Sequence, residues 1–369
     1  MTLTNYWWLL VWLFTGGAFL AWFFPKRKEV VYGKVEERWE ILPAIILVVP
    51  YIIWAGFRTD GFGDTGVYRT NFLDAPSQLG QLPEYLETIT KDKGFAVLTV
   101  LLKTIIGNSD IAFFLIIAAF QMICLALIYR KYSCNYWVSI FLFVASTDYM
   151  SWPHNGVRQF MAITIIMAAT PLLLKKKYVP LIAIIFLAST FHASALIMIP
   201  IVFIVQGKAW NTKTLLCIIA CICALLFVDR FTNILDSALS NTQYSNMVTD
   251  WQEWQDDGTN PIRVLVYSIP MILSIVGRKQ MKEDSNPMID VMQNFSILTF
   301  GTALVSMGTS GIFLGRMISY SSVYSISILL PWEIEHIFTK ESSRLMKLAM
   351  VLGYIAFFYY QMHLTWGIL

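Results

Sequence analysis

Three arginines in apolar surroundings carry the clearest chemical signal in this 369-residue sequence. Arg58 opens a glycine-rich stretch, Arg158 follows the break-prone stretch 152–156, and Arg316 lies inside an apolar run. An arginine at membrane depth costs about 2.5 kcal/mol or more on insertion scales, so it normally faces a cavity, a partner or a ligand. Its guanidinium fork matches phosphate oxygens. Arginines converging on one outer cavity would bind a phosphate or diphosphate, whereas each one alone could snorkel to the lipid headgroups.

Two kinds of side chain could act as a general base beside such a site. His192 has no charged residue within a dozen positions on either side, and a neutral imidazole can accept the proton of an attacking hydroxyl. Asp60 and Asp64 follow Arg58 closely, so either carboxylate could orient that arginine, bind sugar hydroxyls or act as the base. The alternatives are a histidine hydrogen-bonded to a neighbouring helix and a solvated turn. The choice between His192 and Asp64 stays open.

A second polar stretch holds aromatic and acidic residues together. Trp251 and Trp254 lie among four carboxylates between positions 250 and 257, which is one way to build a saccharide-stacking surface. An interfacial aromatic belt beside a solvated acidic loop explains the same pattern. No third clear metal ligand accompanies the Asp60–Asp64 pair, and the five cysteines lie in or beside apolar runs. We therefore expect no metal and no cofactor.

The composition determines which elements can position these residues. The chain is 57% hydrophobic and 14% charged, and its apolar residues come in blocks long enough to cross a bilayer as helices. We expect an all-α polytopic membrane protein forming one transmembrane domain over 1–369, compatible with a GT-C-like bundle. The twelve expected spans are 6–24, 41–57, 111–129, 135–150, 157–174, 178–191, 192–206, 214–229, 262–277, 288–307, 312–331 and 345–363.

Basic residues predict the orientation of these spans. They cluster after every odd-numbered span, which the positive-inside rule assigns to the cytoplasm. Both termini and the two larger loops, 58–93 and 230–261, then face outward. The first apolar run is followed, not preceded, by positive charge, so it resembles an anchor and not a cleaved signal.

Two segments are ambiguous in length. Residues 178–205 are too long for one comfortable span, so we expect two short helices that break around 190–192, with a single tilted span as the alternative. The run 94–106 contains Lys103 and is too short to cross, so we expect a re-entrant or interfacial helix there.

An ordered set of motifs resembles the EpsG/Wzy-like membrane polysaccharide polymerases. The set covers about 50–330 and comprises Arg58, Asp64, Tyr68, Lys93-Gly94-Phe95, Gly156-Val157-Arg158-Gln159, Phe191-His192-Ala193-Ser194 and Arg316 with Tyr320. The acidic residue usual before Gly-Phe could correspond to Asp92 or to the position of Lys93, so no role is carried over there.

The resemblance implies an enzyme at the outer face of a bacterial cytoplasmic membrane. Such proteins join oligosaccharide repeat units carried on undecaprenyl diphosphate, so the expected activity is a metal-independent glycosyl transfer that needs no nucleotide sugar. Arg158 and Arg316, with Arg58, would stabilise charge on the diphosphate. His192 or Asp64 would accept the proton of the acceptor hydroxyl. The remaining expected substrate-binding residues are Asp60, Tyr68, Gln159 and Tyr320.

Two other classes of protein fit the same sequence. A transporter or flippase of lipid-linked oligosaccharide would also need outward arginines and aromatics, but we find no convincing internal repeat. A ligase or an O-acyltransferase would use a similar histidine and arginines. No glycine-rich phosphate loop is present, and no nucleic-acid partner is expected. Expected partners are membrane lipids, a flippase and a chain-length regulator.

Overall fold

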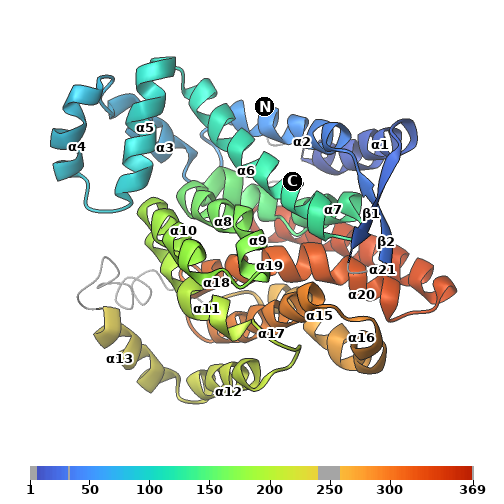
Figure 1. The fold of residues 1–369 in the computed structure, drawn as a ribbon. Coiled ribbons are helices and arrows are strands. Elements are labelled where there is room, and N and C mark those ends of the chain that lie inside the picture. Colours follow the sequence, from blue (N-terminus) through green and yellow to red (C-terminus); the bar gives the residue numbers. More distant parts are fainter. Residues whose placement is uncertain (1–5, 32–33, 240–257, 368–369) are drawn as a thin grey trace. The chain divides into compact units, whose positions relative to one another are not determined.

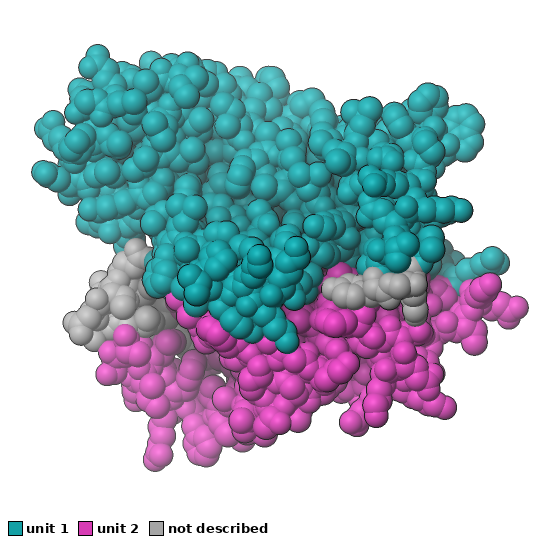
Figure 2. Space-filling model, viewed as in Figure 1, with its two compact units in different colours: residues 1–196, 344–369 teal, residues 197–343 magenta. Residues whose placement is uncertain are grey.

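The chain folds almost entirely into helices that form two compact units. The computed structural model describes residues 6–31, 34–239 and 258–367 (Figure 1). Unit 1 comprises residues 1–196 and 344–369, and unit 2 comprises residues 197–343 (Figure 2). Whether the two units make the single transmembrane domain expected from the sequence stays a prediction.

Unit 1 contains the motifs from Arg58 to His192. Its elements are α1 (Trp7–Phe23), β1 (Lys26–Val31), β2 (Lys34–Trp39), α2 (Ile41–Gly56), α3 (Thr65–Asp74), η2 (Leu79–Gln81), α4 (Leu82–Thr88), α5 (Lys93–Ile106), α6 (Asp110–Tyr132), α7 (Tyr136–Ala145), η3 (Met150–Asn155), α8 (Val157–Ala168), α9 (Thr170–Leu174), α10 (Tyr178–Phe191), most of η4 (Ala193–Ile197) and of α21 (Lys340–Tyr359), and η6 (Tyr360–Thr365).

Unit 2 contains the motif around Arg316. Its elements are α11 (Met198–Ile204), α12 (Thr212–Leu226), α13 (Val228–Leu239), α15 (Pro261–Val276), α16 (Arg278–Asp284), α17 (Pro287–Met307), α18 (Leu314–Met317), α19 (Ser319–Tyr324), η5 (Ser325–Leu329) and α20 (Leu330–His336).

A short hairpin is an exception within the predicted all-α fold. Strands β1 and β2 pair antiparallel from Lys26 opposite Trp39 to Val31 opposite Lys34. The guanidinium of Arg130, near the end of α6, donates to the Trp39 carbonyl at 2.6 Å and so holds the hairpin against that helix. The segment contains the β-branched residues Val30, Val31 and Val35, which favour strands, and Val30 lies opposite Val35 in the ribbon.

The expected twelve spans are not confirmed. Among the described residues, three helices are long and apolar enough to cross a membrane, or five if each of two bent pairs forms one span. The three are 110–132, 287–307 and 340–365, and they match three expected spans. Six further apolar helices have only 10–17 residues. A 17-residue helix rises about 25 Å, less than the roughly 30 Å of a hydrocarbon core.

The two ambiguous segments both form helices. Helix α10 ends at Phe191 and His192 is extended (φ −160°, ψ 119°), which confirms the expected break in 178–205. Helix α5 occupies the expected short run, and its Lys103 Nζ donates to the Ala75 carbonyl at 2.6 Å. The expected loop 58–93 itself contains α3 and α4, which lie beside α5 (Figure 1).

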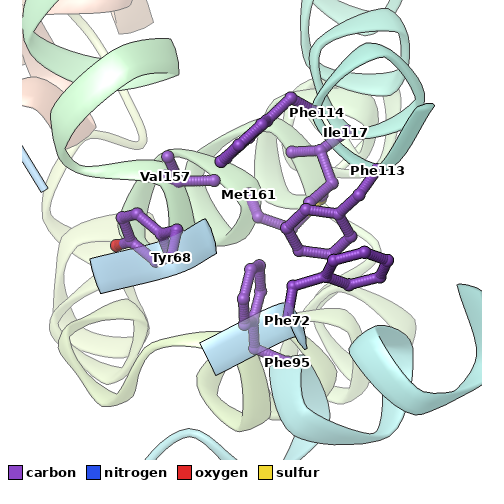
Figure 3. Packing of buried hydrophobic residues seen from close by; sticks show 8 residues of the cluster. All are labelled: Tyr68, Phe72, Phe95, Phe113, Phe114, Ile117, Val157 and Met161. Atoms are coloured by element: carbon purple, nitrogen blue, oxygen red, sulfur yellow. The ribbon is translucent and has the colours of Figure 1, made fainter. Parts of the chain in front are cut away.

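An aromatic cluster packs α3, α5, α6 and α8 together. Phe72 stacks on Phe113 with ring centroids 4.4 Å apart, and Phe95 meets Phe113 edge-on at 6.3 Å (Figure 3). Tyr68 and Phe114 complete the aromatic part of this buried cluster. Such rings bury a large apolar area with well-defined geometry. The cluster therefore fixes the four elements that carry the candidate site.

Candidate functional site

A small cavity in unit 1 lies against the aromatic cluster. It has a volume of about 130 Å³ and is bounded by α3, α4, α5, α6 and α8. Apolar rings form its walls, and a few polar groups converge on it, as in most small-molecule sites. The lining residues are Tyr68, Asn71, Phe72, Tyr85, Ile89, Lys91, Asp92, Phe95, Ala96, Thr99, Phe113 and Arg158.

An ion pair between Arg158 and Asp92 lies in this lining. Arg158 Nη1 is 2.9 Å from Asp92 Oδ2; the aspartate side chain is 6% exposed, and that of the arginine is 41% exposed. The Arg158 guanidinium also lies over the Tyr68 ring, 5.8 Å from its centroid. Asp92 thus holds one side of the guanidinium, while much of the arginine remains accessible. An arginine held in this way is positioned to bind an anion.

The backbone at the start of α5 explains the position of Asp92. This residue has φ 57°, in the left-handed region, which aspartate tolerates better than most residues. The backbone N–H of Ala193 donates to the Asp92 carboxylate. A Cβ on Gly94 would lie 2.1 Å from Thr190 Oγ1 and 2.9 Å from its carbonyl carbon. The close approach of α5 to the end of α10 therefore requires a glycine and joins Asp92 to the 192–194 segment.

Burial changes the acidity of Asp92. Loss of solvent raises the pKa of this carboxyl above its usual range, although Arg158, the Ala193 N–H and Lys91 each act in the opposite direction. The desolvation cost is therefore larger than the stabilisation from the partners. Asp92 consequently takes up a proton at a higher pH than an exposed aspartate would.

His192 lies one residue before the Asp92 contact. Its Nδ1 is 2.6 Å from Ser194 Oγ, and the side chain is half-buried. The histidine is absent from the lining of the cavity, but Ala193 joins its segment to Asp92. The chain therefore brings His192 into the neighbourhood of the Arg158–Asp92 pair, and its role as a base stays a prediction.

The two expected carboxylates lie at the start of α3. Asp60 forms an ion pair with Arg69, whose Nε also binds Asp110 Oδ2 at 2.6 Å. Asp60 therefore pairs with Arg69 and not with Arg58, whose orientation was one of the three roles open to either carboxylate. Asp64 is half-buried, and its backbone N–H donates to Asn155 Oδ1 at 3.1 Å.

Arg58 is built into the packing of unit 1. Its Nη1 donates to the carbonyls of Pro153 at 2.7 Å and His154 at 3.4 Å, and its Nε donates to the Ala55 carbonyl. The guanidinium also lies 4.3 Å from the centroid of the Phe114 ring. Burial lowers the pKa of Arg58 to about 10. Arg58 thus ties the end of α2 to η3, and it does not line the cavity.

The other expected site residues are distributed over the chain. Gln159 follows Arg158 on α8 and is 2% exposed. Arg316 is half-buried in α18, and Tyr320 is buried in α19, both in unit 2. Arg158 lies in unit 1 and Arg316 in unit 2, so the expected convergence of these two arginines stays a prediction. The proposed stacking residues, Trp251 and Trp254, lie outside the described residues.

Sequence reasoning assigned no role to the polar groups that accompany Arg158 in the cavity. Asn71, Tyr85, Lys91 and Asp92 were all passed over. The available signal was the acidic position usual before Gly-Phe in the family pattern, which could correspond to Asp92 or to the position of Lys93. In the described part of the chain, no group of three or more His, Cys, Asp or Glu side chains could hold a metal ion.

Comparison with known families decides the identity of the chain. A model of the EpsG family matches residues 41–366, which is most of the sequence. The chain belongs to the EpsG family. No curated protein and no solved structure matches it. Membership of the EpsG family, together with the long apolar helices, indicates a membrane protein of polysaccharide-polymerase type.

Proposed function

We propose that this EpsG-family chain joins oligosaccharide repeat units carried on undecaprenyl diphosphate, at the outer face of a bacterial cytoplasmic membrane. The family match supports a polymerase. The lipid-diphosphate donor is what the resemblance to the EpsG/Wzy-like polymerases implies, and the arginine of the candidate site suits such an anionic leaving group.

The observation that carries the proposal is the accessible side of Arg158 in the cavity. Asp92 fixes one edge of the guanidinium at 2.9 Å, and Lys91 adds a second positive charge to the same lining. Tyr68, Tyr85 and Phe95 provide rings against which a sugar can pack. An anionic group and an adjoining sugar would each meet a complementary surface here.

The reaction places few demands on the protein. The bond between the anomeric carbon and the diphosphate oxygen breaks, its electron pair leaves with the diphosphate, and a new bond forms to the acceptor hydroxyl oxygen. Arg158 stabilises the charge that grows on the leaving group. His192 or Asp64 accepts the hydroxyl proton. A single displacement of this kind inverts the anomeric centre, and an unchanged anomer in the polymer would contradict it.

A reconstitution tests this function directly. Purified protein in proteoliposomes receives a synthetic lipid-diphosphate repeat unit, and the products are separated by size. A ladder spaced by one repeat is expected for the native chain. The Arg158→Ala variant should lose the ladder at normal protein abundance, whereas Arg344→Ala, which removes an exposed arginine on α21, should keep it. A normal ladder from Arg158→Ala would remove that residue from the site.

The same vesicles distinguish the alternative functions. A flippase would move the lipid-linked unit across the bilayer without joining it to another unit. A ligase or an O-acyltransferase would consume the donor only when a different acceptor is present. Scrambling of the substrate without a ladder would therefore contradict polymerisation and favour transport.

A further inference from the structure

A second and larger cavity lies in unit 2 and shares no residue with the first. Its volume is about 570 Å³, and it opens where α15 and α16 meet at a 78° bend. Its walls come from α15, α16, α17 and the residues before α12. The lining residues are Lys208, Ala209, Trp210, Ser274, Arg278, Met281, Lys282, Ser285, Asp290 and Gln293.

Positive charge dominates this lining. Lys208, Arg278 and Lys282 contribute three cationic side chains, and Asp290 is the only acidic one. The Asp290 carboxylate is buried and already occupied: Lys208 Nζ is 3.2 Å away, and Ser285 Oγ donates at 3.0 Å. No ion pair of Arg278 or Lys282 is found in the described chain. Two positive charges at the rim are thus left for an incoming group.

The bend that places these cations is fixed by close packing. Gly277 separates α15 from α16, and a Cβ there would lie 2.4 Å from Ile337 Cγ1. Any larger residue would push α16 away from α20. Arg278 follows directly, so its position depends on this glycine contact.

A buried amide in the lining lacks a hydrogen-bond partner. Gln293 on α17 is 2% exposed, and its Nε2 makes no hydrogen bond within the described ranges. Leaving such a donor unsatisfied costs about 1–3 kcal/mol. The cost is removed when an acceptor oxygen enters the cavity. Because Gln293 also lines the cavity, its amide is the candidate donor to a ligand oxygen.

The part of the lining formed by Trp210 is held by hydrogen bonds. Trp210 has φ 57°, its backbone N–H donates to Asn294 Oδ1 at 3.1 Å, and its indole N–H donates to Ser274 Oγ at 3.2 Å. Asn294 in turn donates to the Val205 carbonyl at 2.9 Å. These bonds secure a left-handed turn that only a few per cent of non-glycine residues adopt. The wall is thus preorganised, which lowers the entropy cost of binding.

We propose that the unit 2 cavity binds a phosphate-bearing anion. Gln293 Nε2 would donate to one phosphate oxygen, and Arg278 and Lys282 would neutralise its charge from the rim. Arg278 and Lys282 belong to a basic cluster that the positive-inside rule assigns to the cytoplasm. Two sources can supply such a group there: the headgroup of an anionic phospholipid or free phosphate.

Native mass spectrometry of the full-length, delipidated protein tests the proposal. The probes are phosphatidylglycerol, phosphatidylcholine and inorganic phosphate, each titrated separately. The variants are Gln293→Leu and the double variant Arg278→Ala/Lys282→Ala. The control is Lys279→Ala, which removes a charge of the same sign from the same helix but outside the lining. Thermal unfolding of each variant is measured in parallel.

The native chain should retain phosphatidylglycerol or phosphate in preference to phosphatidylcholine. Each variant should weaken that binding about tenfold, as expected for the loss of roughly 1.4 kcal/mol, and Lys279→Ala should not. Retention of phosphatidylglycerol alone identifies a headgroup, and binding of phosphate alone identifies the free anion. Equal binding by the control and the double variant, or equal retention of both lipids, overturns the proposal. If Gln293→Leu lowers the unfolding temperature, its loss of binding could come from misfolding. The binding of the Arg278→Ala/Lys282→Ala variant then decides whether the proposal holds.

Discussion

Two arginines that look alike in the sequence do different work in unit 1. Arg58 donates through Nε and Nη1 to backbone carbonyls and packs on Phe114, whereas Arg158 pairs with one carboxylate beside a cavity. The first arrangement joins parts of the chain, and the second leaves much of the guanidinium accessible. Substitution of Arg58 should therefore reduce mainly the stability of the protein, and substitution of Arg158 mainly its activity.

Replacing Arg58 by methionine should destabilise the protein. The change leaves the buried carbonyls of Pro153 and His154 without their donor, which costs about 1–3 kcal/mol. We expect a lower unfolding temperature in detergent and lower abundance in the membrane. Arg158→Met should abolish polymer formation and lower stability less than Arg58→Met, because Asp92 can take up a proton when its partner is lost. The distinction is wrong if the Arg58 variant is as stable as the native chain.

The raised pKa of Asp92 predicts an acid limb in the activity profile. Because burial raises this pKa, Asp92 becomes neutral at a higher pH than the roughly 3.9 of an exposed aspartate, and its ion pair with Arg158 is lost there. A raised pKa favours the folded state at low pH and loses that contribution as the pH rises through the shifted value. The loss of activity is thus separate from unfolding.

The measurement is the polymerisation rate against pH for the native chain and Asp92→Asn. The native rate should fall on mild acidification, while thermal stability at the same pH is maintained. The amide of the variant cannot titrate, so this protein should be slower at neutral pH and lack that limb. Identical profiles for the two proteins would contradict the assignment of the limb to Asp92.

At the scale of single residues, the sequence pointed to Arg158 but not to its partner Asp92. Arg158 stood out because a charge in an apolar run is costly. Asp92 lies between two lysines, a pattern that usually indicates a solvated turn, and its burial depends on a contact with residue 193 that is distant in the chain. Two of the acceptors of Arg58 are likewise backbone carbonyls about 95 positions away, and the sequence gives no sign of such contacts because any residue type has a carbonyl.

At the scale of elements, the junction of α5 with α10 determines the geometry of the site. Helix α5 begins at Lys93 directly after Asp92, and α10 ends at Phe191 directly before His192. One packing contact, at Gly94, therefore positions both an acid and a candidate base. The sequence predicted the break at 190–192 correctly, because an apolar stretch of that length cannot be one comfortable span.

Gly94→Ala tests this junction. The new methyl group would overlap the Thr190 side chain and backbone, and overpacking of this kind typically costs about 1–3 kcal/mol. We expect a lower unfolding temperature and a reduced polymerisation rate. Gly80→Ala is the control, since a Cβ there meets nothing within 4 Å. Equal unfolding temperatures and polymerisation rates for the two variants would show that the contact between Gly94 and Thr190 does not position the site.

The number of spans was less predictable than the presence of helices. Apolar blocks specify which residues avoid water, but helix ends depend on local breaks such as the one at Ala169, which separates α8 from α9 within the expected span 157–174. The hairpin of β1 and β2 was missed for a related reason. Its stability depends on Arg130 of α6, which is far away in sequence.

At the scale of the whole molecule, the distribution of charge predicts a sidedness that labelling can measure. In a cysteine-free background, Lys28→Cys on β1 and Glu87→Cys on α4 each introduce one exposed thiol. The positive-inside rule places Lys28 in the cytoplasm and Glu87 outside. A membrane-impermeant maleimide should label intact cells at position 87 and should label position 28 only after permeabilisation. The reverse pattern would invert the orientation.

The composition of unit 1 has a consequence for how the protein is made. Because this unit combines residues 1–196 with 344–369, its last helix contributes partners such as Phe358, whose ring lies 5.7 Å from that of Trp7. A ribosome delivers those residues only after all of unit 2. Unit 1 is therefore begun before unit 2 and completed after it, so its early helices gain their contacts with α21 only at the end of synthesis.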